Sequence, residues 1–332
     1  MENDGKKMAV ERLWIKKWWA WLFAIFLICL ILGDILIVFL THGSNVNVDT
    51  VLLGTNIEKI SDNEITVLSL NMAHGRGNGK NQIFQSKDVI SQNVKMIGDI
   101  IKREKPQFVA LQEADDASWW SGNFSHVEMA GRIGGMRAAI QAHNVDGLGL
   151  HYGAAILTTF DVTEARQFTF PRNIPTFSKG FVIATCEWPD DPDFLFDVIS
   201  LHLDFARAEV REAQIHELSQ VLRKNNRPFI IMGDFNTDME GKLLPQFSDE
   251  LDLTTWARDD ETIITFPGLG HRIDWIFVNN GFKIIEQEIL DDIVSDHRVV
   301  RARIKRVRFR SNFLIHNRKF LFKCPSCPKQ YV

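Results

Sequence analysis

The chain has 332 residues and a formal net charge of −4, and its 45% hydrophobic and 24% charged residues are the proportions of a globular protein with a sizeable core. This length accommodates one large domain with appendages or two modest domains. Arg301 to Val332 contains ten Lys or Arg and no acid, so the residues before it sum to −14, which disfavours broad electrostatic capture of long nucleic acids.

The first 63 residues predict a membrane anchor followed by a linker. Trp18–Leu40 is 23 residues long with one charge, Asp34, which is about the length of a membrane-spanning helix. Five basic residues lie within residues 1–17 and no Lys or Arg follows the span before Lys59, which places the N-terminus in the cytoplasm and the remaining chain outside. A cleaved signal peptide is the alternative, but no small-x-small cleavage site follows the apolar stretch. Residues 41–63 are polar and without periodicity, and they predict a linker from the membrane.

Strand-like and helix-like patterns fill residues 64–305, which we predict to be a single domain. The apolar spacing predicts helices over Lys87–Glu104, His126–Gly134 and Ala206–Arg223. Short apolar runs predict strands over Glu64–Asn71, Gln107–Glu113, Tyr152–Thr158, Gly180–Cys186, Phe194–Asp204, Phe229–Met232, Arg272–Val278 and Val299–Ile304. Helices separate some strands and hairpin-like spacing separates others, which favours two packed sheets flanked by helices over one doubly wound sheet. The glycine-rich stretch Met72–Asn81 predicts a mobile loop.

Polar side chains stand where these predicted strands end. Five strand ends carry Asn71, Glu113, His202, Asp234 with Asn236, and Asp296 with His297, and a sixth strand contains Asp274. Each residue taken alone could close a turn, cap a loop or pack in the core. Together they indicate a site for a hard cation and a phosphate, held on a rigid scaffold.

The order of these motifs resembles that of the endonuclease/exonuclease/phosphatase superfamily, which includes DNases, inositol-polyphosphate 5-phosphatases and neutral sphingomyelinases. The resemblance covers about residues 65–304. It rests on Leu70-Asn71, Leu111-Gln112-Glu113, Ser200-Leu201-His202-Leu203-Asp204, Gly233-Asp234-Phe235-Asn236, Arg272-Ile273-Asp274 and Ser295-Asp296-His297. It implies a four-layer α/β sandwich and Mg²⁺-dependent hydrolysis of a phosphoester, with Mn²⁺ as a substitute.

The chemistry of the side chains and the resemblance together assign roles for water attack on phosphorus. Asp234 would orient or deprotonate the water, and Asn236 would donate to a non-bridging oxygen. His202 and His297 would stabilise charge at the transition state, and one of them would protonate the leaving oxygen. By family analogy, Asp274 would fix the tautomer of His202.

Metal and substrate contacts are predicted from the remaining residues. Glu113 is the carboxylate best suited to hold Mg²⁺, which keeps several of its waters, with Asn71 and Asp296 as further ligands. Trp119 and Trp120 are expected near the mouth of the site, where they would stack on a base or meet an acyl or headgroup surface. Packing beneath the adjoining loop is the alternative for both.

The sequence says less about the substrate and the binding partners than about the chemistry. The basic C-terminal tail, residues 306–332, mixes cations with apolar side chains and suits an anionic membrane surface, with nucleic acid or a merely solvated tail as alternatives. We therefore expect lipid headgroup phosphoesters ahead of nucleic acid and small soluble phosphoesters. A catalytically inactive membrane scaffold is the rival, and the sequence indicates no protein partner. Cys324 and Cys327 form a lone C-x-x-C, which is weak evidence for zinc and could form a disulfide.

Overall fold

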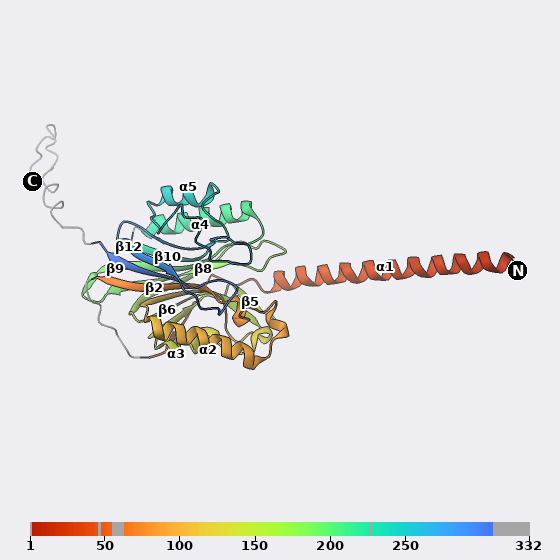
Figure 1. Ribbon diagram of the computed structural model, residues 1–332, viewed down its shortest axis with the longest axis horizontal. Coiled ribbons are helices and arrows are strands. Elements are labelled where there is room, and N and C mark those ends of the chain that lie inside the picture. Colours follow the sequence, from red (N-terminus) through yellow and green to blue (C-terminus); the bar gives the residue numbers. More distant parts are fainter. Residues whose placement is uncertain (1, 46–47, 55–62, 226, 308–332) are drawn as a thin grey trace, which may run out of the picture.

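The computed structural model describes residues 2–45, 48–54, 63–225 and 227–307. The predicted basic tail beyond Val307, including Cys324 and Cys327, lies outside these described residues. The first element, α1 (Glu2–Leu40), is a long helix that projects from the body (Figure 1). Its Lys16–Leu40 part is long and apolar enough to cross a membrane, a test that a signal sequence also passes.

The body contains two sheets packed face to face. The order of strands in the first sheet is β1 (Asp49–Leu52), β4 (Ala138–Gln141), β6 (Leu150–Thr158), β3 (Phe108–Asp115), β2 (Glu64–Asn71), β13 (Val300–Arg306) and β12 (Phe282–Ile289), with β5 (Val145–Gly147) paired to β6. The order in the second sheet is β11 (Asp274–Val278), β10 (Phe229–Asp234), β9 (Asp191–His202), β8 (Gly180–Trp188) and β7 (Val162–Thr169). Only β2 with β3 and β9 with β10 are parallel pairs among the described strands.

Helices cover the outer faces and complete the four-layer α/β sandwich that the sequence predicts (Figure 1). The first sheet is covered by α2 (Lys87–Glu104) and α3 (His126–Gly134), and the second by α4 (Ala208–Asn225) and α5 (Leu243–Glu250). Large aromatic side chains fill the space between the sheets, among them Phe108, Trp188, Phe196 and Phe282. Burial of these rings removes much apolar area from water and fixes how the two sheets face each other.

The parallel pairs bring the predicted strand ends to one edge of the sandwich. In the first sheet Asn71 pairs with Gln112, next to Glu113. In the second sheet Asp234 lies between His202 on β9 and Asp274 on β11 in the strand register. The packing of the two sheets therefore faces these two sets of side chains toward each other.

The segment that follows α1 differs from the predicted free linker. The backbone N–H of Gly43 donates to the carbonyl of Asn144 at 3.0 Å, and the carbonyl of Thr41 accepts from the N–H of Asp146 at 2.8 Å. Further along, β1 pairs with β4 in antiparallel register. Four residues make too short a strand to be recognised from its own pattern, because pairing with β4 is what makes it one. Residues 41–45 and 48–54 are therefore part of the body.

Candidate active site

A cleft of about 480 Å³ opens at the edge where the strand ends meet. It is lined by the seven predicted residues Asn71, Glu113, His202, Asp234, Asn236, Asp296 and His297, together with Arg76, Phe205, Arg211, Thr237, Asp238, Phe266, Leu269, His271 and Ile273. Asp274 does not line the cleft and lies behind His297. The seven residues predicted at five strand ends thus line one cleft, and Asp274 contacts it through His297.

Asp234 is the centre of the polar contacts in the cleft. Its Oδ2 accepts from Asn71 Nδ2 at 3.0 Å and lies 3.5 Å from His202 Nε2 and 3.8 Å from His297 Nε2. The preceding Gly233 has φ +151°, and a Cβ there would lie 2.0 Å from the Leu201 carbonyl oxygen, so only glycine lets β10 pass so close to β9. Burial raises the pKa of Asp234 to about 7, against the opposing charge of His297. A carboxylate with such a pKa is suited to accept a proton near neutral pH.

Asp274 holds His297, and the expectation that it holds His202 is wrong. His297 Nδ1 lies 3.0 Å from Asp274 Oδ2 and 3.1 Å from Oδ1, and Asp274 is fully buried. Burial lowers the pKa of His297, but the charges of Asp274 and then Asp234 outweigh it and raise the pKa to about 10. His297 is therefore a cation at neutral pH. Asp274 is the first residue of β11, which pairs with β10 on the side away from β9, so β10 separates Asp274 from His202.

His202 has a different partner and a different charge. Lys179 Nζ lies 3.5 Å from His202 Nδ1, and because an ammonium can only donate, the proton of the neutral ring belongs on Nε2, which faces Asp234. Burial and then the charge of Lys179 lower the pKa of His202 well below its ordinary value. The two cleft histidines thus differ at neutral pH, since His202 is neutral and His297 is charged.

Glu113 lies across the cleft among cationic groups. Its carboxylate oxygens are 3.5 Å from His74 Nε2, 3.6 Å from Lys179 Nζ and 3.7 Å from Arg76 Nη1. Burial raises its pKa, but His74 and Lys179 outweigh burial and lower it. These separations are longer than hydrogen bonds, so the ionised carboxylate keeps lone pairs for a cation. Its backbone φ of 47° is in the left-handed region, where a non-glycine residue is strained, as is common at functional positions.

Asp296, the third predicted metal ligand, is engaged by another side chain. Arg76 Nη2 donates to Asp296 Oδ2 at 2.5 Å, which links the glycine-rich loop after β2 to the loop before β13. A bridge between Gly77 and Ser295 joins the same two loops. Within the described residues this loop is therefore docked, in contrast to the mobile loop that its glycines predict. The donor set that fits Mg²⁺ best is Glu113 with the remaining carbonyl lone pair of Asn71. Asp296 is already paired with Arg76 through Oδ2, so only its remaining lone pairs are open to a cation.

Neither predicted tryptophan lines the cleft. Trp120 Nε1 donates to Asp115 Oδ1 at 2.8 Å, and its ring packs against Tyr152 and His74. Trp119, which precedes it in the short 3-10 helix η3 (Trp119–Ser121), is 60% exposed. The packing alternative therefore describes Trp120, while Trp119 is exposed on the surface outside the cleft lining.

Three functional candidates are missing from the sequence prediction: His74, Arg76 and Lys179. His74 Nδ1 donates to Asp115 Oδ2 at 2.6 Å while its Nε2 faces Glu113, so it supports the predicted metal ligand from behind. The glycine-rich loop offered a signal for His74 and Arg76, because these two polar side chains flank Gly75 within five residues of Asn71. A single lysine before β8 offered none, and only the tertiary fold brings Lys179 to the cleft.

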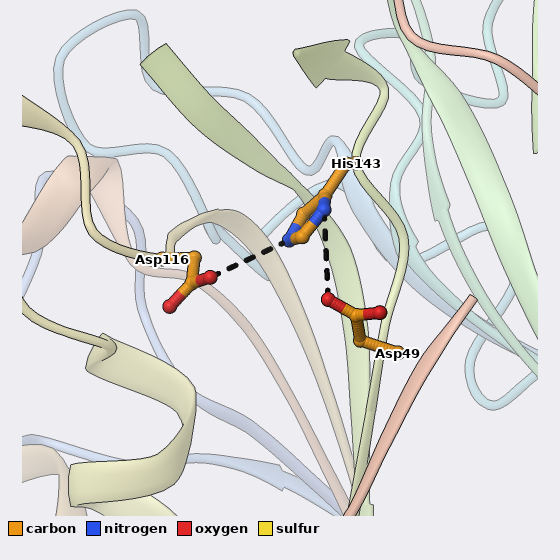
Figure 2. A group of neighbouring side chains, drawn as sticks. All are labelled: Asp49, Asp116 and His143. Atoms are coloured by element: carbon orange, nitrogen blue, oxygen red, sulfur yellow. Dashed lines mark ion pairs between the residues drawn. The ribbon is translucent and has the colours of Figure 1, made fainter. Parts of the chain in front are cut away.

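A second group of carboxylates around a histidine lies outside the cleft (Figure 2). His143 lies 3.8 Å from Asp49 Oδ2 through Nδ1 and 3.8 Å from Asp116 Oδ2 through Nε2. Figure 2 shows the two carboxylates facing different nitrogens of the ring. Asp49 begins β1 and His143 follows β4, so this group lies where the segment after α1 pairs with the body.

The sequence of this chain matches a known protein family. A family model described as "Endonuclease/Exonuclease/phosphatase family" matches residues 90–297, more than half of the chain. No curated protein matches the chain significantly by sequence.

Several solved structures share the fold. An endonuclease/exonuclease/phosphatase family protein from Leptotrichia buccalis C-1013-b is 18% identical with a TM-score of 0.56, over 73% of this chain and 99% of that chain. The catalytic domain of human Nocturnin with bound sulfate is 17% identical with a TM-score of 0.52, over 78% and 98%. A mannosyl-6-phosphatase from Bacteroides thetaiotaomicron VPI-5482 is 18% identical with a TM-score of 0.52, over 72% and 99%. At these identities the likeness is one of fold.

Proposed function

Because this chain belongs to the endonuclease/exonuclease/phosphatase family, we propose that it is a membrane-anchored, Mg²⁺-dependent hydrolase of phosphodiester-type bonds, with lipid headgroup phosphoesters as its substrate class. The observation that carries the hydrolase proposal is the position of Asp234, a buried carboxylate whose pKa is raised to about 7, between a neutral His202 and a cationic His297. Strongly shifted pKa values on neighbouring groups that line a cleft are typical of active sites. The intact set argues against the inactive scaffold.

The residues present support in-line attack of water on phosphorus. Asp234 accepts a proton from the attacking water while the oxygen of that water forms its bond to phosphorus. His297, charged and fixed by Asp274, stabilises the developing negative charge and delivers a proton to the leaving oxygen as its bond to phosphorus breaks. His202 donates from Nε2 and Asn236 lies at the cleft wall, so both are placed to hold non-bridging oxygens.

Metal dependence is proposed from the donor set. Glu113 and Asn71 would hold Mg²⁺, and a bound divalent cation supplies Lewis-acid polarisation of the phosphoryl oxygens. Manganese has similar oxygen preferences and would substitute. Arg76 and Lys179 add fixed positive charge on the same side of the cleft. Both cations are placed to attract an anionic substrate.

Two observations support the proposed membrane anchor and the preference for lipid substrates. α1 is joined to the body through residues 41–45, and exposed apolar side chains, Phe205 and Leu269, stand at the cleft wall. Apolar side chains at the mouth suit a substrate presented with its acyl region nearby. By contrast, a nuclease would need a cationic surface that contacts successive phosphates of a nucleic-acid strand.

The test is a substrate comparison with the full-length protein in detergent micelles and Mg²⁺. We expect phosphate-containing headgroup to be released from phosphodiester lipids in mixed micelles faster than supercoiled plasmid is nicked. Rapid plasmid cleavage with no lipid turnover would favour the nuclease, and turnover of neither, nor of any small phosphoester, would favour the inactive scaffold.

A further inference from the structure

The end of α1 and the active-site cleft lie at the same edge of the sandwich. His42, two residues after α1, forms a bridge with Val145 on β5, which pairs with Tyr152 on β6, which in turn pairs with Asp115 at the end of β3. The last described strand points the other way: β13 runs antiparallel to β2, away from this edge, and its Lys305 pairs with Glu64 at the start of β2. Figure 1 shows α1 beside β5.

No spacer separates the predicted membrane span from this edge. The 23 residues of Trp18–Leu40 form a helix about 34 Å long at ~1.5 Å per residue, and the hydrocarbon core of a bilayer is about 30 Å thick. The span therefore ends at Leu40, where the body begins. His42 Nδ1 lies 2.6 Å from Ser178 Oγ, and the Arg172 guanidinium lies over the Phe39 ring at 4.2 Å. These contacts fix the edge close to the surface of any membrane that holds α1.

Exposed apolar side chains continue from α1 along this edge. Gly147 lies against the Leu40 carbonyl, and Leu148 beside it is 56% exposed with φ 53° at the tip of the β5–β6 hairpin. Gly149 lies against the Trp119 ring, and its carbonyl accepts from the backbone N–H of Trp119 at 3.1 Å. The helix η3 that begins at Trp119 packs beside η2 (Gln82–Phe84). The Phe84 side chain at the end of η2 is 87% exposed. We call Ile83, Phe84, Trp119 and Leu148 the apolar rim.

We propose that the apolar rim seats on the outer surface of the bilayer that holds α1 and so turns the cleft toward that surface. The inference rests on the anchoring part of the proposed function. Trp and Phe side chains are favoured at the level of lipid headgroups, and Arg172, exposed beside Phe39, is placed to pair with lipid phosphates. The bilayer is already present at the end of α1, so seating requires no partner from solution. Binding is intramolecular and therefore effective even where each side chain contributes little.

The test places an environment-sensitive bimane label at single positions of the full-length protein in nanodiscs of phosphatidylcholine and phosphatidylglycerol. The background carries Cys29→Ser, Cys186→Ala, Cys324→Ser and Cys327→Ser, and the labels are attached to Phe84→Cys and Leu148→Cys. The matched control is Leu52→Cys, because Leu52 is 72% exposed but pairs with Ala138 at the opposite edge of the sheet. Lipids with a nitroxide near the headgroup quench bimane that lies at the membrane surface.

We expect quenching at Phe84→Cys and Leu148→Cys to exceed that at Leu52→Cys several-fold, and adding Trp119→Glu to the labelled variants to reduce it. Equal quenching at all three positions would overturn the proposal, because it would mean that the body does not seat by this edge. The readout needs no turnover, so an inactive protein that seats and an active protein that does not seat are distinguished.

Discussion

Asp274 fixes His297 from behind, with 3.0 Å between Oδ2 and Nδ1, while Nε2 of the same ring faces Asp234 at 3.8 Å. The relationship makes one histidine of the cleft a permanent cation at neutral pH. It also sets the order of the three groups: an orienting carboxylate, a charged imidazole and a second carboxylate with a raised pKa. Substitution of each of these three residues should therefore change catalysis in a different way.

Asp274→Asn should lower kcat by about 10–100-fold, as is typical when a group that orients a catalytic side chain is lost. It should also shift the alkaline limb of the pH–rate profile to lower pH, because His297 loses the charge that contributes most to its raised pKa. An unchanged pH–rate profile in Asp274→Asn would contradict the assignment.

The raised pKa of His297 also predicts how the stability of the fold depends on pH. The protonated ring stabilises the fold below pH 6.5, its ordinary pKa, and this contribution is lost as pH rises toward about 10. Thermal unfolding measured across this pH range tests it.

Glu113→Gln should raise the Mg²⁺ concentration needed for half-maximal activity, because the amide keeps the shape of the side chain but loses its charge. Asp296→Asn is the matched comparison and should have the smaller effect, since Asp296 is paired with Arg76 at 2.5 Å. Titration calorimetry with Mg²⁺ or Mn²⁺ separates binding from turnover. Wild-type metal affinity in Glu113→Gln would show that the metal is held elsewhere.

Trp120→Phe should destabilise the fold by about 1.5–3 kcal/mol, the typical contribution of a hydrogen bond to a charged group. The lost bond is the one to buried Asp115, and because Trp120 does not line the cleft, KM should stay unchanged. Trp119→Ala, at a 60% exposed position, is the control and should leave the unfolding temperature unaltered. A raised KM with normal stability in Trp120→Phe would instead support direct contact of Trp120 with substrate.

Seven of the residues that the sequence singles out line one cleft, but the sequence did not indicate the side chains that support them. Strand-end residues could be predicted because each motif sits on a long apolar run, and helix α2 has the predicted bounds because Ser86 caps its first turn and Pro106 follows its end. The partner of Asp274 could not be predicted, because it depends on how the loop of His297 folds over β11. Nor could β1 be predicted, since its four residues become a strand only by pairing with β4.

Gly43→Ala should release the segment after α1 from the body. A Cβ at Gly43 would lie 1.8 Å from the His143 carbonyl oxygen, so the backbone must move and its hydrogen bond to Asn144 must break. Gly54→Ala is the matched control, because the nearest atom, the Met136 carbonyl oxygen, is 3.6 Å from the added carbon. Hydrogen exchange over residues 41–54 is the measurement. Faster exchange is expected only in Gly43→Ala, and equal protection in both variants would mean that the segment is not held as described.

The central claim is that the cleft hydrolyses phosphoesters with a metal held by Glu113, a base at Asp234 and a charged acid at His297. The most direct measurement is release of nitrophenol from bis-nitrophenyl phosphate by the full-length protein in detergent, with Mg²⁺ and with chelator. We predict turnover that the chelator abolishes and that Asp234→Asn or His297→Ala lowers by about 10²–10⁴-fold, the usual contribution of general acid–base catalysis. Asp234→Asn should unfold at the same or a higher temperature, because it removes a buried charge while keeping an acceptor for Asn71. Turnover that survives the chelator, or that persists at the wild-type rate in a folded Asp234→Asn protein, would contradict the account.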